Sequence, residues 1–339
     1  MRSLSVHRER LDGPARVHGL TTLALREAQV RSHGILCTYT LPGNVISLGR
    51  YHLVPEDSEA RGVGLARRMG GGRPAPLGGG FAGVVLALPH RAGLLAPGSS
   101  LVPEQILNRY ARGLLGALEA LGVRAYYPGR DLVTVDGRIV ASLGFELAPD
   151  GATLVEMSLA VERSFACVST FADRADPSGV VPMELLLPEQ GTCVADIVGR
   201  APDLDDVTAA LATGYASRLG CDVVVGDGLG PIAPDASWLD AGRLASHLDR
   251  HAAVRDMLGV IEVYAAWVGD RVDDVRVCGD LLAPSGSVAR VEAALRGASI
   301  DRAVLRRRVV DALVAPDDVL LGLRDPATVG DLVFEACRP

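Results

Sequence analysis

Residues 131–161 read DLVTVDGRIVASLGFELAPDGATLVEMSLAV and decide the fold class. The segment contains three runs typical of β-strands, at residues 131–135, 139–147 and 153–161. Asp136-Gly137 and Asp150-Gly151 separate these runs, and tight hairpin turns need the positive φ that glycine provides. Consecutive hairpins indicate an antiparallel or mixed sheet and exclude a doubly wound parallel one. We therefore expect an α+β fold with mixed or antiparallel sheets flanked by helices.

The rest of the chain adds helices, further strands and a second unit. Residues 34–41 and 84–89 resemble strands, and residues 103–121 and 204–219 have the apolar period of helices. Residues 222–238 are rich in Gly, Pro and Asp, so we expect a loop or linker there. After it the pattern predicts a small α+β unit with a helix at 240–257, strands at 259–268 and 274–279, helices at 287–295 and 300–313, and a short helix from Thr328. The predicted domains are residues 1–235 and residues 236–339.

Composition excludes several functional classes. The 339 residues carry a net charge of −7, and the dispersed basic residues provide no stripe for nucleic acid. The chain has neither an apolar run of about 18 residues nor an apolar run behind its charged N-terminus. We therefore expect a cytoplasmic protein that is not bound to a membrane. The six cysteines show no CxxC spacing, which argues against a zinc site and a dense disulfide framework and leaves no metal site predicted.

Residues 67–83, RRMGGGRPAPLGGGFAG, are the clearest candidate binding segment. Glycines let backbone N–H groups approach an anion, and arginines neutralise its charge. The segment is neither a GK[ST] loop nor a GxGxxG turn after a strand. A glycine-rich surface loop is the alternative interpretation.

Three segments together resemble one family. RRMGGGRPAPLGGG resembles the RRxxGGG…HD…GN signature of lipoate–protein ligases. PGRDLVTVDGRIVASLGFEL, at residues 128–147, resembles the GRNDL…xGRKIxG segment of these ligases and the corresponding segment of octanoyltransferases. Residues 259–297 resemble the small accessory domain at the C-terminus of the ligases. The resemblance implies a domain of the biotin/lipoate ligase type at residues 1–235, followed by an accessory-type domain at 236–339.

The resemblance also implies a set of binding residues. Arg67, Arg68 and the loop glycines Gly70, Gly71 and Gly72 match positions that wrap an acyl-adenylate, and Gly129, Arg130 and Asp131 match the segment near the nucleotide. It implies ATP with Mg²⁺ as cofactor, a lipoyl- or acyl-AMP intermediate and a small carboxylic acid as substrate. A lipoyl-domain or H-protein-like partner would be the acyl acceptor.

The family's catalytic lysine has no counterpart. Its position is Ile139, with Arg138 beside it, and the chain contains no lysine at all. Because neighbouring side chains of a strand point to opposite faces, Arg138 is expected to point away from the site. Arg73 in the loop is the better substitute cation, and a solvated loop charge is the alternative. Glu156 falls where the relatives place a histidine.

Other side chains leave further interpretations open. Cys167 lies where octanoyltransferases carry a cysteine nucleophile, although a buried structural cysteine is the more ordinary interpretation. His247 and His251, four residues apart on the helix expected there, are interpreted as a solvated face. Three functions remain: an ATP-dependent acyl ligase, a thioester-dependent acyltransferase that uses Cys167, and a non-catalytic protein that binds an acyl group, a nucleotide or a lipoyl domain.

Overall fold

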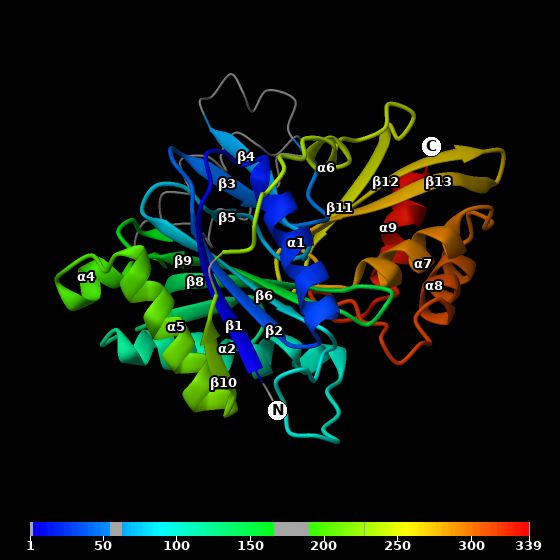
Figure 1. Ribbon diagram of the computed structural model, residues 1–339. Coiled ribbons are helices and arrows are strands. Elements are labelled where there is room, and N and C mark those ends of the chain that lie inside the picture. Colours follow the sequence, from blue (N-terminus) through cyan, green and yellow to red (C-terminus); the bar gives the residue numbers. More distant parts are fainter. Residues whose placement is uncertain (1–2, 55–62, 166–189, 227, 339) are drawn as a thin grey trace.

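A mixed sheet forms the centre of the molecule (Figure 1). The computed structural model describes residues 3–54, 63–165, 190–226 and 228–338. Within them, seven strands form the sheet in the order β10-β1-β2-β6-β9-β8-β7. The first three are parallel to one another and the others are antiparallel. This confirms the expected α+β class. The strands are β1 (Ser3–Arg10), β2 (Gly34–Thr40), β6 (Phe81–Leu88), β7 (Leu132–Val135), β8 (Arg138–Leu147), β9 (Thr153–Ala160) and β10 (Asp222–Val225).

The two hairpins of residues 131–161 form as expected. Asp136 and Gly137 have φ values of 50° and 77° in the turn between β7 and β8. Leu143 of β8 lies opposite Met157 of β9 in the next pair. Gly151 has a φ of 90° in the turn between these strands. The turns therefore set the strand order of this edge of the sheet.

Both faces of the sheet are covered, because alternate residues of each inner strand enter different apolar cores. One core contains Leu86 and Val155 with α2 (Ile106–Ala120) and α5 (Leu204–Leu219). The other contains Val85 and Leu154 with α1 (Arg16–Arg31). A small sheet, β4-β3-β5, lies on the α1 side, and its strands are β3 (Val45–Leu48), β4 (Gly64–Arg67) and β5 (Ala75–Pro76).

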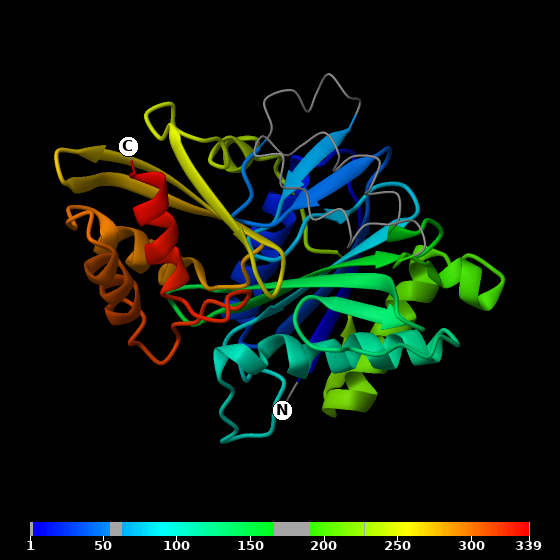
Figure 2. The ribbon, with the colours of Figure 1, turned by 180° about the vertical axis from the view of Figure 1, so that it is seen from behind.

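The C-terminal part has a sheet and an apolar core of its own and lies beside the central sheet (Figure 2). Its antiparallel strands are β11 (Arg250–Arg255), β12 (Val260–Val268) and β13 (Arg271–Gly279). Its helices are α7 (Ser285–Leu295), α8 (Arg302–Asp311) and α9 (Thr328–Ala336). The strands and helices expected after residue 258 are thus present. The division of the chain at residue 235 stays a prediction.

Two expectations were wrong. Residues 222–238 are not only a linker, because β10 pairs in parallel with β1 from Ser3↔Asp222 onward and Ser237–Asp240 form the short helix α6. Residues 240–257 are not one helix, because Arg250–Arg255 pair with β12 as β11. Pairing with distant strands decided both segments, and local periodicity does not record it. Every helix of the described ranges is too short or too polar to cross a bilayer.

Candidate functional site

Arg67 ends β4, Arg68 follows it, and the two side chains point to different places. Arg67 donates from Nη1 to the carbonyl oxygen of Trp238 at 3.0 Å, toward the C-terminal part. Arg68 donates from Nη2 to the carbonyl oxygen of Arg73 at 2.6 Å, beneath the glycine-rich loop. Both side chains are buried. Alternation along an extended chain explains the divergence and assigns the two cations to different places.

The N–H groups of the glycine-rich loop are bound to acceptors of the protein itself. Gly70 donates to Glu156 Oε2 at 2.7 Å, and Gly71 donates to the carbonyl oxygen of Phe145 at 3.3 Å. Gly72 donates to the carbonyl oxygen of Leu281, in the C-terminal part, at 2.6 Å. In this conformation the loop therefore presents none of these three donors to an external anion.

Close backbone packing explains why this loop is built of glycine. A Cβ atom on Gly71 would lie 2.1 Å from the carbonyl oxygen of Leu281, and one on Gly70 would lie 2.8 Å from the nitrogen of Phe145. Gly72 has a φ of 98°, in the region that favours glycine. The loop is thus pressed between β8 and the C-terminal part and is not a solvated surface loop.

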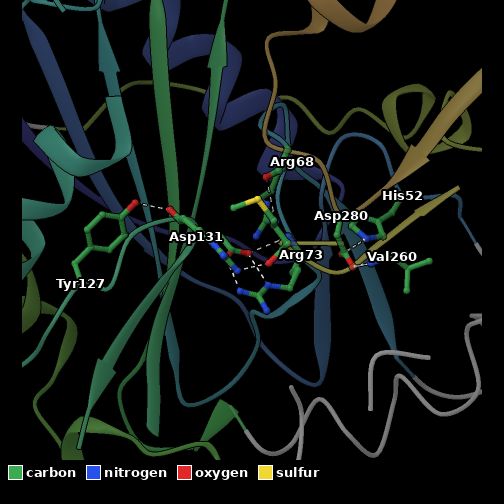
Figure 3. A network of polar contacts seen from close by, with 10 residues as sticks. His52, Arg68, Arg73, Tyr127, Asp131, Val260 and Asp280 are labelled. Carbon is green, nitrogen blue, oxygen red and sulfur yellow. Dashed lines mark hydrogen bonds and ion pairs between the residues drawn. The ribbon is translucent and has the colours of Figure 1, made fainter. Parts of the chain in front are cut away.

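Arg73 forms a two-point ion pair with Asp131 (Figure 3). Its Nε lies 2.8 Å from Asp131 Oδ2, and its Nη2 lies 2.5 Å from Oδ1. The side chains are 13% and 1% exposed. Burial lowers the pKa of Arg73, but the charge and hydrogen bond of Asp131 outweigh burial and raise it. The structure thus joins two segments far apart in sequence and keeps Arg73 charged.

A pocket of about 660 Å³ opens beside this pair, and we call it the Arg73 pocket. Gly129 and Arg130 line it from the segment before β7, and Arg255 and Asp256 line it from the end of β11. Arg130, at a φ of 69°, donates to the carbonyl oxygen of Met257 and so bridges to the C-terminal part. Arg73, Arg130 and Arg255 line the pocket beside Asp256, and guanidinium groups are the usual partners of anionic groups such as phosphate.

A buried carboxylate with a raised pKa lies beneath the loop. Glu156 of β9 accepts hydrogen bonds from the Gly70 N–H and from Thr21 Oγ1 of α1, the latter at 3.3 Å. Burial raises its pKa to about 7, although the Gly70 hydrogen bond and the Arg68 charge oppose the rise. The sequence comparison singled out Glu156, because the relatives have a histidine at that position. It did not single out Thr21, because no helix was expected at Arg16–Arg31.

The position of the family's lysine lies in an apolar environment. Ile139 is 7% exposed and belongs to a cluster that includes Ala75, Phe81 and Cys193. Arg138 is exposed and pairs in register with Val135 of β7. A catalytic role for Arg138 or for position 139 stays a prediction.

The cysteines and histidines fall as follows. Cys167 lies outside the described residues. The cysteine that the structure brings next to Ile139 is Cys193, which is buried, and burial raises the pKa of its thiol. His247 and His251 share no helix: His247 contacts Asp274 at 2.9 Å, and His251 of β11 contacts Glu262 at 3.0 Å. In the described part of the chain no three potential metal ligands gather.

One turn of the C-terminal part fastens the loop in place. Besides the Gly72–Leu281 bond, Asp280 Oδ1 lies 3.0 Å from His52 Nε2, on the segment after β3 (Figure 3). Glu146 of β8 accepts hydrogen bonds from both the N–H and the hydroxyl of Ser285, each at 2.9 Å. The candidate site is therefore built jointly by the central sheet and the C-terminal part.

Comparisons with known proteins agree with this architecture. No protein-family model and no curated protein sequence matches the chain. Among solved structures, LipL1 of P. falciparum in complex with lipoate matches with a TM-score of 0.68 and 11% identity, over 90% of this chain and 93% of that chain. A bipartite lipoate protein ligase of Thermoplasma acidophilum, studied with its E2 lipoyl domain, matches with a TM-score of 0.52 and 17% identity, over 66% and 86%. Lipoate-protein ligase A bound with ATP matches with a TM-score of 0.51 and 16% identity, over 67% and 89%. The chain therefore has the fold of the lipoate–protein ligases.

Proposed function

We propose that the protein is an ATP-dependent acyl ligase of the lipoate–protein ligase type. It would activate a lipoyl- or octanoyl-type carboxylate as the acyl-adenylate and pass the acyl group to an amine, such as a lysine of a lipoyl-domain or H-protein-like partner. The observation that carries the proposal is the Arg73 pocket. Its lining includes Arg73, Gly129 and Arg130, three positions singled out from the sequence, and its volume is about 660 Å³.

The pocket suits a nucleotide without any opening of the loop. Gly70, Gly71 and Gly72, whose N–H groups are bound to acceptors of the protein, do not line the pocket. Arg73 does line it. Asp131 binds Nε and Nη2 of Arg73, so Nη1 is the guanidinium nitrogen that we expect to contact a phosphate oxygen. Preorganised guanidinium groups of this kind stabilise charge that develops on a transferring phosphoryl group. ATP with Mg²⁺ is the expected cosubstrate.

The C-terminal part supports a ligase more than a simple transferase. Residues 1–235 are a smaller share of the chain than the 90% that the LipL1 match covers, so that match extends into the C-terminal part. In the family that the sequence resembles, the accessory domain accompanies adenylation. In this protein that part also supplies Arg255 and Asp256 to the Arg73 pocket.

A second candidate is a non-catalytic protein that binds an acyl group, a nucleotide or a lipoyl domain. The observation in its favour is Ile139, which places an apolar side chain in an apolar cluster where the family has its lysine. Without a cation there, stabilisation of charge during acyl transfer is expected to fall by several kcal/mol, roughly the cost of removing one such donor. Binding would survive this loss, but rapid transfer would not.

The decisive test is carboxylate-dependent exchange between ATP and pyrophosphate, with lipoate and octanoate as substrates. Wild-type protein is expected to exchange, and Arg73→Ala is expected to lose at least about tenfold in ATP affinity because a charge-assisted contact is removed. Arg307→Ala is the matched control, since Arg307 is an exposed arginine of α8 far from the pocket in sequence. Unchanged ATP binding by Arg73→Ala would show that Arg73 is not the substitute cation.

Two further results separate the alternatives. Folded protein that shows no exchange with either acid but binds a non-hydrolysable octanoyl-adenylate analogue would support the binding protein over the ligase. Mass spectrometry after incubation with an octanoyl thioester would detect the transferase, and the adduct should be absent from Cys167→Ser.

A further inference from the structure

A second arginine-lined pocket lies between the small β4-β3-β5 sheet and the C-terminal part, and we call it the Arg67 pocket. It encloses about 380 Å³. Its charged lining comprises four arginines and two acids: Arg50, Arg67, Arg276, Arg296, Asp274 and Glu292. Of these residues, none lines the Arg73 pocket. The two pockets are therefore distinct binding spaces.

Two of the four arginines are matched by carboxylates. Arg296 Nε lies 2.7 Å from Asp274 Oδ1, and Arg50 Nη1 lies 3.4 Å from Glu146 Oε2. These pairs offset the charges of Arg296 and Arg50. They do not involve Arg67 or Arg276.

The other two arginines donate to backbone carbonyl oxygens. Arg67 donates to those of Arg50 and Trp238, and Arg276 donates to those of Arg243 and Ala241, at 2.7 and 3.0 Å. Within the described ranges neither forms a salt bridge. Carbonyl dipoles orient these cations but leave their charge uncompensated.

The two cations also repel each other. Burial, together with the neighbouring charges of Arg276 and Arg50, lowers the pKa of Arg67 to about 10. The indole ring of Trp238, 4.8 Å from the Arg67 guanidinium and 5.0 Å from that of Arg50, offsets part of this repulsion. A ring face attracts a cation without neutralising it, so the pocket retains an attraction for an anion.

The remaining acid of the pocket offsets the charge of this pair only in part, through Arg276. Glu292 of α7 accepts a hydrogen bond from the Val277 N–H at 2.9 Å, and burial raises its pKa. Its carboxylate is thus committed to the backbone of β13 and disfavoured in its charged form.

We propose that the Arg67 pocket binds a phosphate-type oxyanion carried on a small molecule, held by Arg67 and Arg276. Charge-assisted contacts from guanidinium groups are the usual means of recognising such oxyanions. The volume falls within the range of small-molecule sites, about 300–1,000 Å³, so a phosphorylated ligand larger than the free ion fits. Arg67 belongs to β4 of the small sheet, and Arg276 belongs to β13 of the C-terminal part. The bound anion therefore contacts both parts of the molecule. This inference does not depend on the proposed ligase activity.

The test uses the full chain and two probes, inorganic phosphate and pyrophosphate, in a phosphate-free buffer of constant ionic strength. Titration calorimetry measures affinity, and thermal unfolding measures the stabilisation that binding to the folded state produces. Arg276→Gln is expected to weaken binding by about tenfold or more. Arg271→Gln, which removes another β13 arginine that donates to a carbonyl oxygen but lies outside the pocket, is expected to leave binding unchanged.

Glu292→Gln provides a test of opposite sign. The amide oxygen can keep the Val277 bond while the acid is removed, so phosphate affinity is expected to rise. This variant also serves if Arg276→Gln proves poorly folded. Arg73→Gln separates the two pockets and is expected to retain this binding. The proposal is overturned if neither probe binds at millimolar concentration, or if binding persists in Arg276→Gln and is lost in Arg73→Gln.

Discussion

Replacing Glu156 by glutamine should remove a large pH dependence from the stability of the protein. Its carboxyl is buried beneath the loop, and its pKa is raised from 4.5 to about 7, chiefly by burial. Between these values the folded protein holds a proton that the unfolded chain has lost. Stability from this group is therefore greatest at low pH and falls as pH rises toward 7.

The magnitude follows from the two pKa values. A rise from 4.5 to about 7 is worth about 3 kcal/mol, at about 1.36 kcal/mol for each pH unit. Between about pH 5 and pH 8 the wild type should lose about 2 to 3 kcal/mol of unfolding free energy through this group alone. Glu156→Gln keeps an oxygen for the Gly70 N–H and has no proton to lose, so it should lack this component.

Urea denaturation of both proteins across this pH range measures the difference between their unfolding free energies. Other titrating groups contribute equally to both proteins and cancel in this difference. Glu162→Gln, the same change at an exposed glutamate just after β9, should follow the wild type. Parallel pH profiles for wild type and Glu156→Gln would refute the reasoning, because they would mean that burial does not perturb this carboxyl.

Two further changes test the ion pair and the loop. Asp131→Asn should cost about 3–5 kcal/mol of unfolding free energy, because it leaves the buried Arg73 without its charged partner. The same variant should bind ATP more weakly, because Arg73 loses the two-point contact that orients its guanidinium. Chemical denaturation measures the change in unfolding free energy, and calorimetry measures ATP affinity. A loss of less than about 1 kcal/mol is what an exposed ion pair contributes, so it would argue against a buried pair. Gly71→Ala should cost about 1–3 kcal/mol, because its Cβ would overlap the carbonyl oxygen of Leu281. Gly13→Ala is its control, since nothing lies within 4 Å of a Cβ there, and equal losses in the two variants would contradict close packing at Gly71.

Local sequence was sufficient for the hairpin edge of the sheet. Asp-Gly turns have a conformational requirement that few residues meet, so β7, β8 and β9 were expected close to their observed bounds. Likewise α5 begins at Leu204 and ends at Leu219, with Asp203 accepting the Asp206 N–H at its start and Gly220 at its end. The β1 strand and α1 were missed, and β11 was mistaken for a helix, because their identity depends on distant strands.

For the site too, the sequence predicted some features and only the structure showed others. Sequence alone identified the glycine-rich loop, the Gly129–Asp131 segment and the absence of any lysine, because residue type and order are local information. It could not show that Arg67 and Arg68 serve different spaces, or that Glu156 and Leu281 occupy the loop's N–H groups. These facts depend on contacts between residues far apart in the chain, since the packing of the C-terminal part against the central sheet sets which donors stay open and which charges stay unpaired. The chain's own residue types determined its chemistry, and only the tertiary structure decided where that chemistry is available to a ligand.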